Sequence, residues 1–149
     1  LAPCTAEAVI AILDHYGIEI AGARVAVVGR SNVIGRPVAA LLTMRDATVT
    51  LCHSRTVDLP SVTREAEILV VAAGRARMIG SGYVAPGQTV IDVGINWDET
   101  TQKLVGDVDA EAIKDTAAAY TPVPGGVGSV TTAILAKHVI EAAERTLVS

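Results

Sequence analysis

At 149 residues, with half of them hydrophobic, 19% charged and a net charge of −4, the chain is long enough for one domain with a sizeable core. We therefore expect a single domain over residues 1–149. No basic stripe is present to neutralise nucleic-acid phosphates, and no apolar run approaches the ~18 residues of a membrane span. The composition thus predicts neither a nucleic-acid nor a membrane partner.

Cysteine usage points to a reducing compartment. Cys4 and Cys52 are far apart and form no C-x-x-C pair, so we expect two free, buried thiols and no disulfide or metal site. This favours a cytoplasmic protein. The chain begins with Leu1 and the phrase Leu1-Ala2-Pro3-Cys4, which looks like the middle of a longer polypeptide.

In chain order, apolar strands alternate with amphipathic helices. The first helix is capped by Thr5 and ended by Gly17. The later predicted helices cover residues 35–45, 59–66, 110–116 and 127–147. The predicted strands cover residues 24–28, 48–52, 68–72 and 89–93, and a hairpin is expected within 97–108. This alternation predicts an α/β fold of the Rossmann-like kind, a doubly wound, mostly parallel sheet with helices on both faces.

The stretch over residues 24–37 organises the chain. Its β-branched strand breaks at Gly29, a polar turn follows, and a helix begins near Gly35. Such a turn presents unpaired helix N–H groups to an anion. The spacing Gly-x-Ser-x-x-x-Gly differs from the familiar Gly-x-Gly-x-x-Gly, so the pattern by itself leaves dinucleotide binding open.

All four predicted strands end in small or polar residues, as a flat cofactor lying across strand ends requires. These ends are Gly29-Arg30-Ser31, His53-Ser54-Arg55, Ala73-Gly74 and Gly94-Ile95-Asn96. The alternative is that glycine merely ends strands in any α/β protein. Four such ends together favour nucleotide binding.

The second strand end discriminates between cofactors. An NAD site usually places Asp or Glu there, but residues 51–55 contain no acid. Arg30, Ser54 and Arg55 could bind a 2′-phosphate, so we predict NADP rather than NAD. Arg55 could equally be a solvated loop residue, and His53 is given no catalytic role.

Asp92 and the segment over residues 122–128 each allow two interpretations. Asp92 at a strand end either touches a ligand or holds its own loop. The segment over residues 122–128 combines two prolines with three glycines before a helix, which suits either an ordinary connection or close approach of a planar ligand to the backbone. We favour the ligand, because three glycines raise the entropy cost of folding.

Seven motifs follow one another along the chain. They are Pro3-Cys4-Thr5, Val27-Val28-Gly29-Arg30-Ser31-Asn32-Val33-Ile34-Gly35-Arg36-Pro37, Ala47-Thr48-Val49-Thr50, His53-Ser54, Ile91-Asp92-Val93-Gly94-Ile95-Asn96, Val105-Gly106-Asp107-Val108 and Thr121-Pro122-Val123-Pro124-Gly125-Gly126-Val127-Gly128. Together they resemble the motifs of the bifunctional methylenetetrahydrofolate dehydrogenase/methenyltetrahydrofolate cyclohydrolase family. The resemblance covers nearly the whole chain and implies the C-terminal, NADP-binding domain of a two-domain enzyme.

The resemblance also implies site residues. Gly29, Arg30 and Ser31 would hold the cofactor phosphates, with Arg30 and Ser54 at the 2′-phosphate. The remaining implied contacts are Val33 and Ile95 beside the cofactor, Thr5 and Thr131 near the nicotinamide, and Pro124, Gly125, Gly126 and Gly128 along the pocket for tetrahydrofolate one-carbon derivatives.

No catalytic residue is expected in this chain. The family's catalytic Tyr-x-x-x-Lys helix belongs to its N-terminal domain, and no tyrosine here has a lysine four residues on. The resemblance implies a homodimer, to which the hairpin could add a sheet edge. Two alternatives remain: a non-catalytic nucleotide-binding or sensor module, and another NADP dehydrogenase of the shikimate-dehydrogenase-like type.

Overall fold

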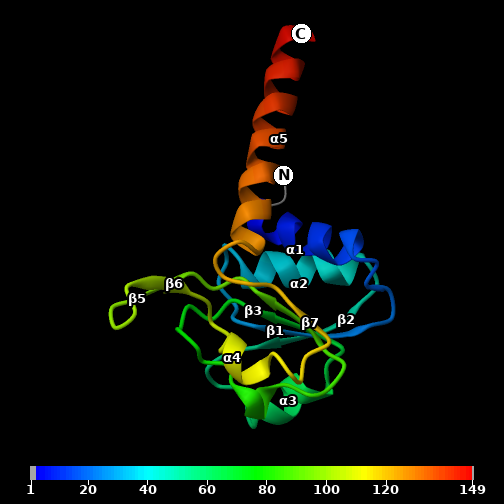
Figure 1. Ribbon diagram of the computed structural model, residues 1–149. Coiled ribbons are helices and arrows are strands. Elements are labelled where there is room, and N and C mark those ends of the chain that lie inside the picture. Colours follow the sequence, from blue (N-terminus) through cyan, green and yellow to red (C-terminus); the bar gives the residue numbers. More distant parts are fainter. Residues whose placement is uncertain (1–2, 149) are drawn as a thin grey trace.

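A parallel sheet of five strands forms the centre of the molecule (Figure 1), a computed structural model that describes residues 3–148. The strand order is β2-β1-β3-β4-β7, and each neighbouring pair is parallel. The strands are β1 (Arg24–Val28), β2 (Thr48–Cys52), β3 (Ile68–Val71), β4 (Thr89–Asp92) and β7 (Ala119–Tyr120). The predicted α/β fold with a parallel sheet is confirmed.

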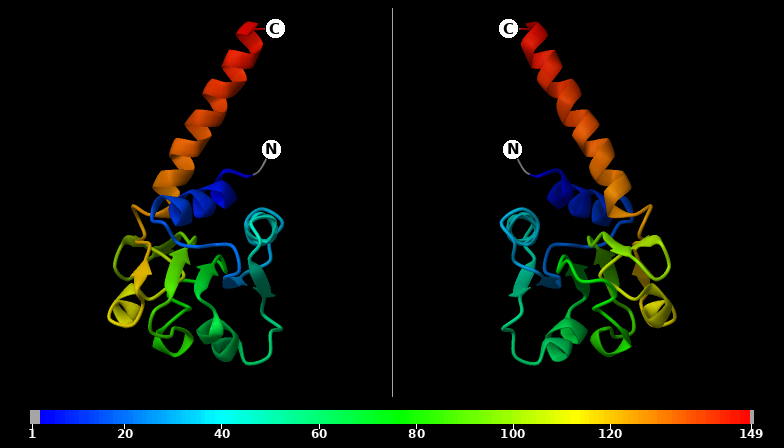
Figure 2. Two further views of the ribbon diagram at one scale, coloured as in Figure 1. Left: turned by 90° about the vertical axis from the view of Figure 1, so that its right-hand side faces the viewer. Right: turned by 90° about the vertical axis from the view of Figure 1, so that its left-hand side faces the viewer.

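Helices cover both faces of this sheet, as predicted (Figures 1 and 2). One face carries α1 (Cys4–His15), α2 (Gly35–Met44) and the start of α5 (Val127–Val148), and the other carries α3 (Leu59–Glu65), α4 (Ala110–Ile113) and the short 3₁₀ helix η1 (Ser81–Tyr83). Successive side chains of a strand point to opposite faces, so Val25 and Val27 join one buried cluster and Ala26 and Val28 join the other.

The first helix begins differently from the prediction. Thr5 is not its cap, because α1 starts at Cys4 and Pro3 occupies the capping position without a side-chain hydrogen bond. Proline suits a helix start, since its φ of −59° is already close to the helical value and it has no N–H to leave unpaired. The apolar stripe of α1 docks on the sheet, where Val9 and Leu13 are fully buried.

Strand and helix ends also differ in detail. The third and fourth strands end at Val71 and Asp92, one residue earlier than predicted, and the fourth helix stops at Ile113. Strand β7 was missed altogether. It has only two residues and no alternating pattern, and pairing with β4 alone makes it a strand.

The predicted hairpin is present as a separate two-stranded antiparallel sheet, β5 (Asn96–Asp98) and β6 (Lys103–Val105). It projects from the body of the molecule, as Figure 1 shows, and its paired residues Trp97 and Leu104 are exposed. The later turns of α5 also extend away from the body (Figure 2). Within residues 3–148, no helix combines the length and the apolarity needed to cross a membrane.

Candidate functional site

Strand register brings the four predicted strand ends to one edge of the sheet. Val28 lies opposite Cys52 on one side and opposite Val71 on the other, and Val71 lies opposite Asp92. Because all these strands are parallel, the residues that follow them emerge side by side. This carboxyl edge is where open α/β sheets bind ligands.

Two glycines allow β1 and α2 to approach each other closely. Gly29 has a φ of +113°, and a Cβ there would collide with the carbonyl group of Ala72. A Cβ on Gly35 would collide with the carbonyl group of Gly29. Both positions therefore require glycine, and the unusual spacing still builds a tight strand–turn–helix unit.

The turn between them offers donors to an anion. The backbone N–H groups of residues 30–33 donate no hydrogen bond within the described part of the chain. Ser31 Oγ accepts hydrogen bonds from the N–H groups of Ile34 at 3.1 Å and Gly35 at 3.5 Å, which leaves its own O–H free to donate. Arg36 Nε donates to the carbonyl oxygen of Arg30 at 3.0 Å and braces the turn.

The loop after β2 forms a compact turn beside this one. The N–H of His53 donates to Thr56 Oγ1 at 2.8 Å, and His53 Nδ1 accepts from the N–H of Arg55 at 3.2 Å. The His53 ring therefore shapes its own loop, while Ser54 and Arg55 are exposed. Val28 and Cys52 are paired at the ends of β1 and β2. Arg30 and Ser54 each follow two residues later, so they leave the sheet side by side.

A buried carboxylate that the sequence analysis did not single out holds the third strand end. Asp107 is fully buried and accepts backbone hydrogen bonds at 2.7, 2.9 and 3.0 Å from Ala73, Gly74 and Arg75. It also accepts one from Asn96 Nδ2 at 2.9 Å. Asp107 thus ties the end of β3 to the end of β4. Its place between the hairpin and the next helix gave no sequence signal for this role.

Asp92 holds the fourth strand end, which decides between its two predicted roles. Its carboxylate accepts hydrogen bonds from the N–H groups of Gly94, Asp107 and Val108, each at 3.0 Å. Burial and, to a smaller extent, the nearby carboxylate of Asp107 raise the pKa of Asp92 to about 6, against the opposing effect of these donors. Asp92 is therefore committed to its own loop.

The proline–glycine segment lines a cavity of about 300 Å³ together with Ile95 and the start of α5. Gly125 has a φ of +96° and open space beside it, whereas a Cβ on Gly126 would collide with the carbonyl oxygen of Pro122. A Cβ on Gly128 would lie 3.6 Å from Ile95 Cδ1. Gly126 is thus required by internal packing, while Gly125 and Gly128 leave room for a ligand.

The three remaining predicted residues lie in the turn after β1 and on two helices. Val33 is 70% exposed in the turn before α2. Thr5 lies in the first turn of α1, and Thr131 lies on α5, where its hydroxyl donates to the carbonyl oxygen of Val127 at 2.9 Å. The structure therefore brings Ile95 to Gly125 and Gly128 and aligns Arg30 with Ser54.

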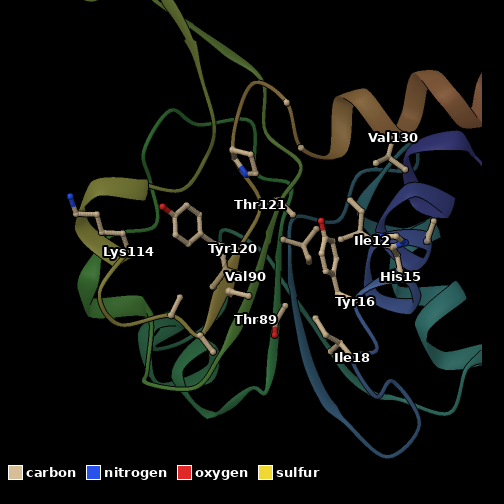
Figure 3. A pocket seen from close by; sticks show the side chains of 18 residues that line it. Ile12, His15, Tyr16, Ile18, Thr89, Val90, Lys114, Tyr120, Thr121 and Val130 are labelled. Carbon is tan, nitrogen blue, oxygen red and sulfur yellow. The ribbon is translucent and has the colours of Figure 1, made fainter.

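A cavity of about 990 Å³ lies elsewhere, between α1 and the strands β4 and β7. Figure 3 shows Tyr16 and Tyr120 on opposite sides of it. Its lining includes Gly125 and Gly126 of the proline–glycine segment but none of the predicted phosphate-binding residues. Because parallel sheets bind nucleotides at the carboxyl ends of their strands, we assign the candidate site to the strand ends.

Comparison with known proteins shows to which family the chain belongs. The sequence model of the tetrahydrofolate dehydrogenase/cyclohydrolase NAD(P)-binding domain matches residues 3–147. The chain belongs to this family. It is the C-terminal, NAD(P)-binding domain of the family, and the chain spans about half the length of the curated relatives it matches.

Individual relatives of this NAD(P)-binding domain are similar over almost all of its length. The "Bifunctional protein FolD" of Parafrankia sp. is 56% identical over 142 residues, which are 95% of this chain and 51% of that protein. The crystal structure of FolD methylenetetrahydrofolate dehydrogenase/cyclohydrolase from Campylobacter jejuni is 41% identical with a TM-score of 0.94, covering 98% of this chain and 51% of that one.

A third relative of the domain was solved with ligands. The N5,N10-methylenetetrahydrofolate dehydrogenase-cyclohydrolase of Trypanosoma brucei, complexed with NADP cofactor and inhibitor, is 41% identical with a TM-score of 0.91. It matches all of this chain, which covers 52% of that protein. The fold of this chain is thus the fold of an NADP-bound relative.

Proposed function

We propose that the chain binds NADP across its strand ends and forms the NADP-binding half of a bifunctional methylenetetrahydrofolate dehydrogenase/methenyltetrahydrofolate cyclohydrolase. The observation that carries the proposal is the turn after β1, where the backbone N–H groups of residues 30–33 have no partner among residues 3–148 and lie beside an exposed arginine. Such donors fit a phosphate group. A relative solved with NADP supports the choice of ligand.

The residues of the turn have distinct roles in this proposal. Gly29 keeps the backbone close to the cofactor phosphates, and the free O–H of Ser31 donates to a phosphate oxygen. Arg30 and Ser54 contact the 2′-phosphate, since each lies two residues beyond the paired last residues of β1 and β2. The absence of a carboxylate from residues 51–57 favours NADP over NAD, because a carboxylate would repel the phosphate.

The folate-facing wall is the cavity between Ile95 and the proline–glycine segment. In the proposed reaction, NADP⁺ accepts hydride from methylenetetrahydrofolate, and the methenyl product is then hydrolysed to the formyl form. The residues proposed to line the folate pocket are Pro124, Gly125, Gly126 and Gly128, with Val33 and Ile95 beside the cofactor and Thr5 and Thr131 toward the nicotinamide. This wall orients both reactants at contact distance, on which hydride transfer depends.

The rest of the parent protein completes the site in this proposal. Residues 1–149 form one nucleotide-binding domain, and a companion domain supplies the catalytic tyrosine and lysine. The exposed apolar side chains Leu135, Val139 and Ile140 on α5 and the half-length match to relatives support such a companion. The isolated chain is then expected to bind cofactor weakly and to catalyse little.

Assembly and location are parts of the same proposal. The exposed Trp97 and Leu104 of the hairpin support a homodimer formed through this domain. The two free cysteines support a cytoplasmic location. A non-catalytic nucleotide sensor and a shikimate-dehydrogenase-like enzyme are less well supported, since the relatives are named as bifunctional folate enzymes.

Titration of the purified chain with NADP⁺ and, separately, with NAD⁺ tests the proposal. Calorimetry is expected to show saturable binding that prefers NADP⁺. The Arg30→Ala variant is expected to lose most of that preference, because one charge-assisted phosphate contact contributes about 1.5–3 kcal/mol, which is about tenfold or more in Kd. Trp97, two residues from Ile95, offers a second signal by fluorescence.

Arg145→Ala is the matched control, since it removes an exposed arginine from the far end of α5. It is expected to bind both cofactors as the unaltered chain does. Equal affinity for NADP⁺ and NAD⁺ would refute the 2′-phosphate assignment. Failure of both cofactors to bind the chain would refute the nucleotide site itself.

A further inference from the structure

A cluster of three side chains lies outside the strand-end site, where the start of α1 crosses α5. Cys4 Sγ is 3.4 Å from Nδ1 of His138, although 134 positions separate the two residues in sequence. On the other side of the same ring, His138 Nε2 is 2.7 Å from Glu7 Oε2. One imidazole therefore connects a thiol with a carboxylate.

The carboxylate determines what the imidazole can do for the thiol. Because Glu7 accepts a hydrogen bond at Nε2, the proton of neutral His138 is held on that nitrogen. Nδ1 then carries the lone pair and faces the thiol. This is the arrangement in which an oriented histidine removes the proton of a nucleophile, with the carboxylate fixing the tautomer.

The position of Cys4 adds a second contribution. Cys4 is the first residue of α1, and no side chain caps this helix end. The unpaired N–H groups and the positive end of the helix dipole stabilise negative charge that develops on the sulfur. Helix N-termini and neighbouring histidines are both recognised sources of thiol reactivity.

The two cysteines differ sharply in their surroundings. Both are free, but the prediction that both are buried is wrong for Cys4, which is only partly buried. Cys52 is fully buried at the end of β2, and burial raises the pKa of its thiol. An added reagent can therefore reach Cys4 in the folded chain but cannot reach Cys52.

We propose that Cys4 is a site of covalent thiol modification that reacts with low-molecular-weight disulfides. His138 Nδ1 takes the thiol proton while Cys4 Sγ attacks one sulfur of the disulfide. A new S–S bond forms as the old one breaks, so Cys4 is oxidised and the departing sulfur is reduced. The departing thiolate then takes the proton from His138, and the exchange needs no other reactant.

Reaction of the chain with glutathione disulfide, followed by mass spectrometry of its peptides, tests this site. The adduct is expected on Cys4 alone, and Cys4→Ser is expected to abolish it. The rate is expected to exceed that of a synthetic peptide of residues 1–17 by at least tenfold. This comparison involves no altered protein, and a Cys4 that reacts no faster than the peptide would overturn the proposal.

Variants of the cluster give the second arm. His138→Gln and Glu7→Gln are each expected to slow the reaction of Cys4 at least tenfold. His15→Gln is the matched control, because it removes an exposed histidine from α1, the helix of Cys4 and Glu7, without touching the cluster. Modification of Cys52 reports unfolding of a variant. A cluster variant in which Cys4 reacts slowly while Cys52 stays unmodified therefore supports the proposal. Unchanged rates in both cluster variants would refute it.

Discussion

Asp92 and Asp107 show how single residues maintain the strand ends. Each carboxylate accepts three backbone N–H groups. The three that Asp92 accepts come from buried residues and would otherwise lack a partner. A Cβ on Gly94 would collide with the carboxylate of Asp107, and a Cβ on Gly106 would collide with that of Asp92. The two glycines therefore leave the space that the carboxylates occupy. The loops facing the proposed cofactor are therefore fixed before any ligand binds.

The raised pKa of Asp92 predicts a pH-dependent stability. Between pH 4 and pH 6 the folded chain holds a proton on this carboxyl that the unfolded chain releases, because the pKa is about 6 in the folded chain against an ordinary value of 3.8. The contribution of Asp92 to the free energy of unfolding therefore falls as pH rises through this range. Relative to Asp92→Asn, the unaltered chain is expected to lose about 2 kcal/mol in its free energy of unfolding between pH 4 and pH 7.

Urea unfolding of both proteins across this pH range measures the effect of Asp92. Asp115→Asn is the control, since it removes an exposed carboxylate from beside α4. The difference in free energy of unfolding between Asp115→Asn and the unaltered chain is expected to stay nearly constant across this pH range. A difference between Asp92→Asn and the unaltered chain that is constant, or that changes with the opposite sign, would contradict the raised pKa.

At the scale of elements, β1 and α2 depend on the contact between two glycines. The helix begins so close to the strand that Gly35 has no space for a Cβ. Gly35→Ala must push α2 away from Gly29, so we expect a loss of about 2–3 kcal/mol in the free energy of unfolding. The same shift is expected to weaken NADP⁺ binding, because it moves the N–H groups of the turn.

Urea unfolding and NADP⁺ titration of Gly35→Ala test this close approach. Gly82→Ala serves as the control, because a Cβ at Gly82 meets nothing within 4 Å. Its stability is expected to stay within about 0.5 kcal/mol of the unaltered chain. Equal effects of the two substitutions would show that the packing of β1 against α2 does not require Gly35.

At the scale of the whole molecule, the hairpin is the candidate contact between copies of the chain. Trp97 is 53% exposed and Leu104 is 42% exposed, and the two residues face each other across the hairpin. Such a projecting apolar pair is costly to leave in water. We therefore expect the unaltered chain to sediment as a dimer and Leu104→Glu to sediment as a monomer.

Val57→Glu is the matched control for this substitution. Val57 is 87% exposed in the loop before α3, so the change adds the same charge away from the hairpin. This variant is expected to remain dimeric in sedimentation velocity. A monomeric unaltered chain, or a dimeric Leu104→Glu, would exclude the hairpin as the dimer contact.

Periodicity and turn chemistry were enough to predict most elements. The four long strands, the five helices and the hairpin lie where the apolar patterns and turn residues place them, because local sequence decides which segments can be buried on a sheet. The seven motifs were enough to identify the family. Arg30 and Ser54 could be paired beforehand, since parallel strands bring their following residues to one edge.

Only the tertiary structure decided the contacts between distant segments. Strand β7 exists because β4 offers it hydrogen bonds. Helix α1 begins at Cys4, with Pro3 rather than Thr5 in the capping position. Asp107 reaches the end of β3 across more than thirty residues, and Cys4 meets His138 across 134. Sequence patterns describe which face of a segment is apolar, but such pairs depend on how the segments cross in space, and no local spacing specifies that.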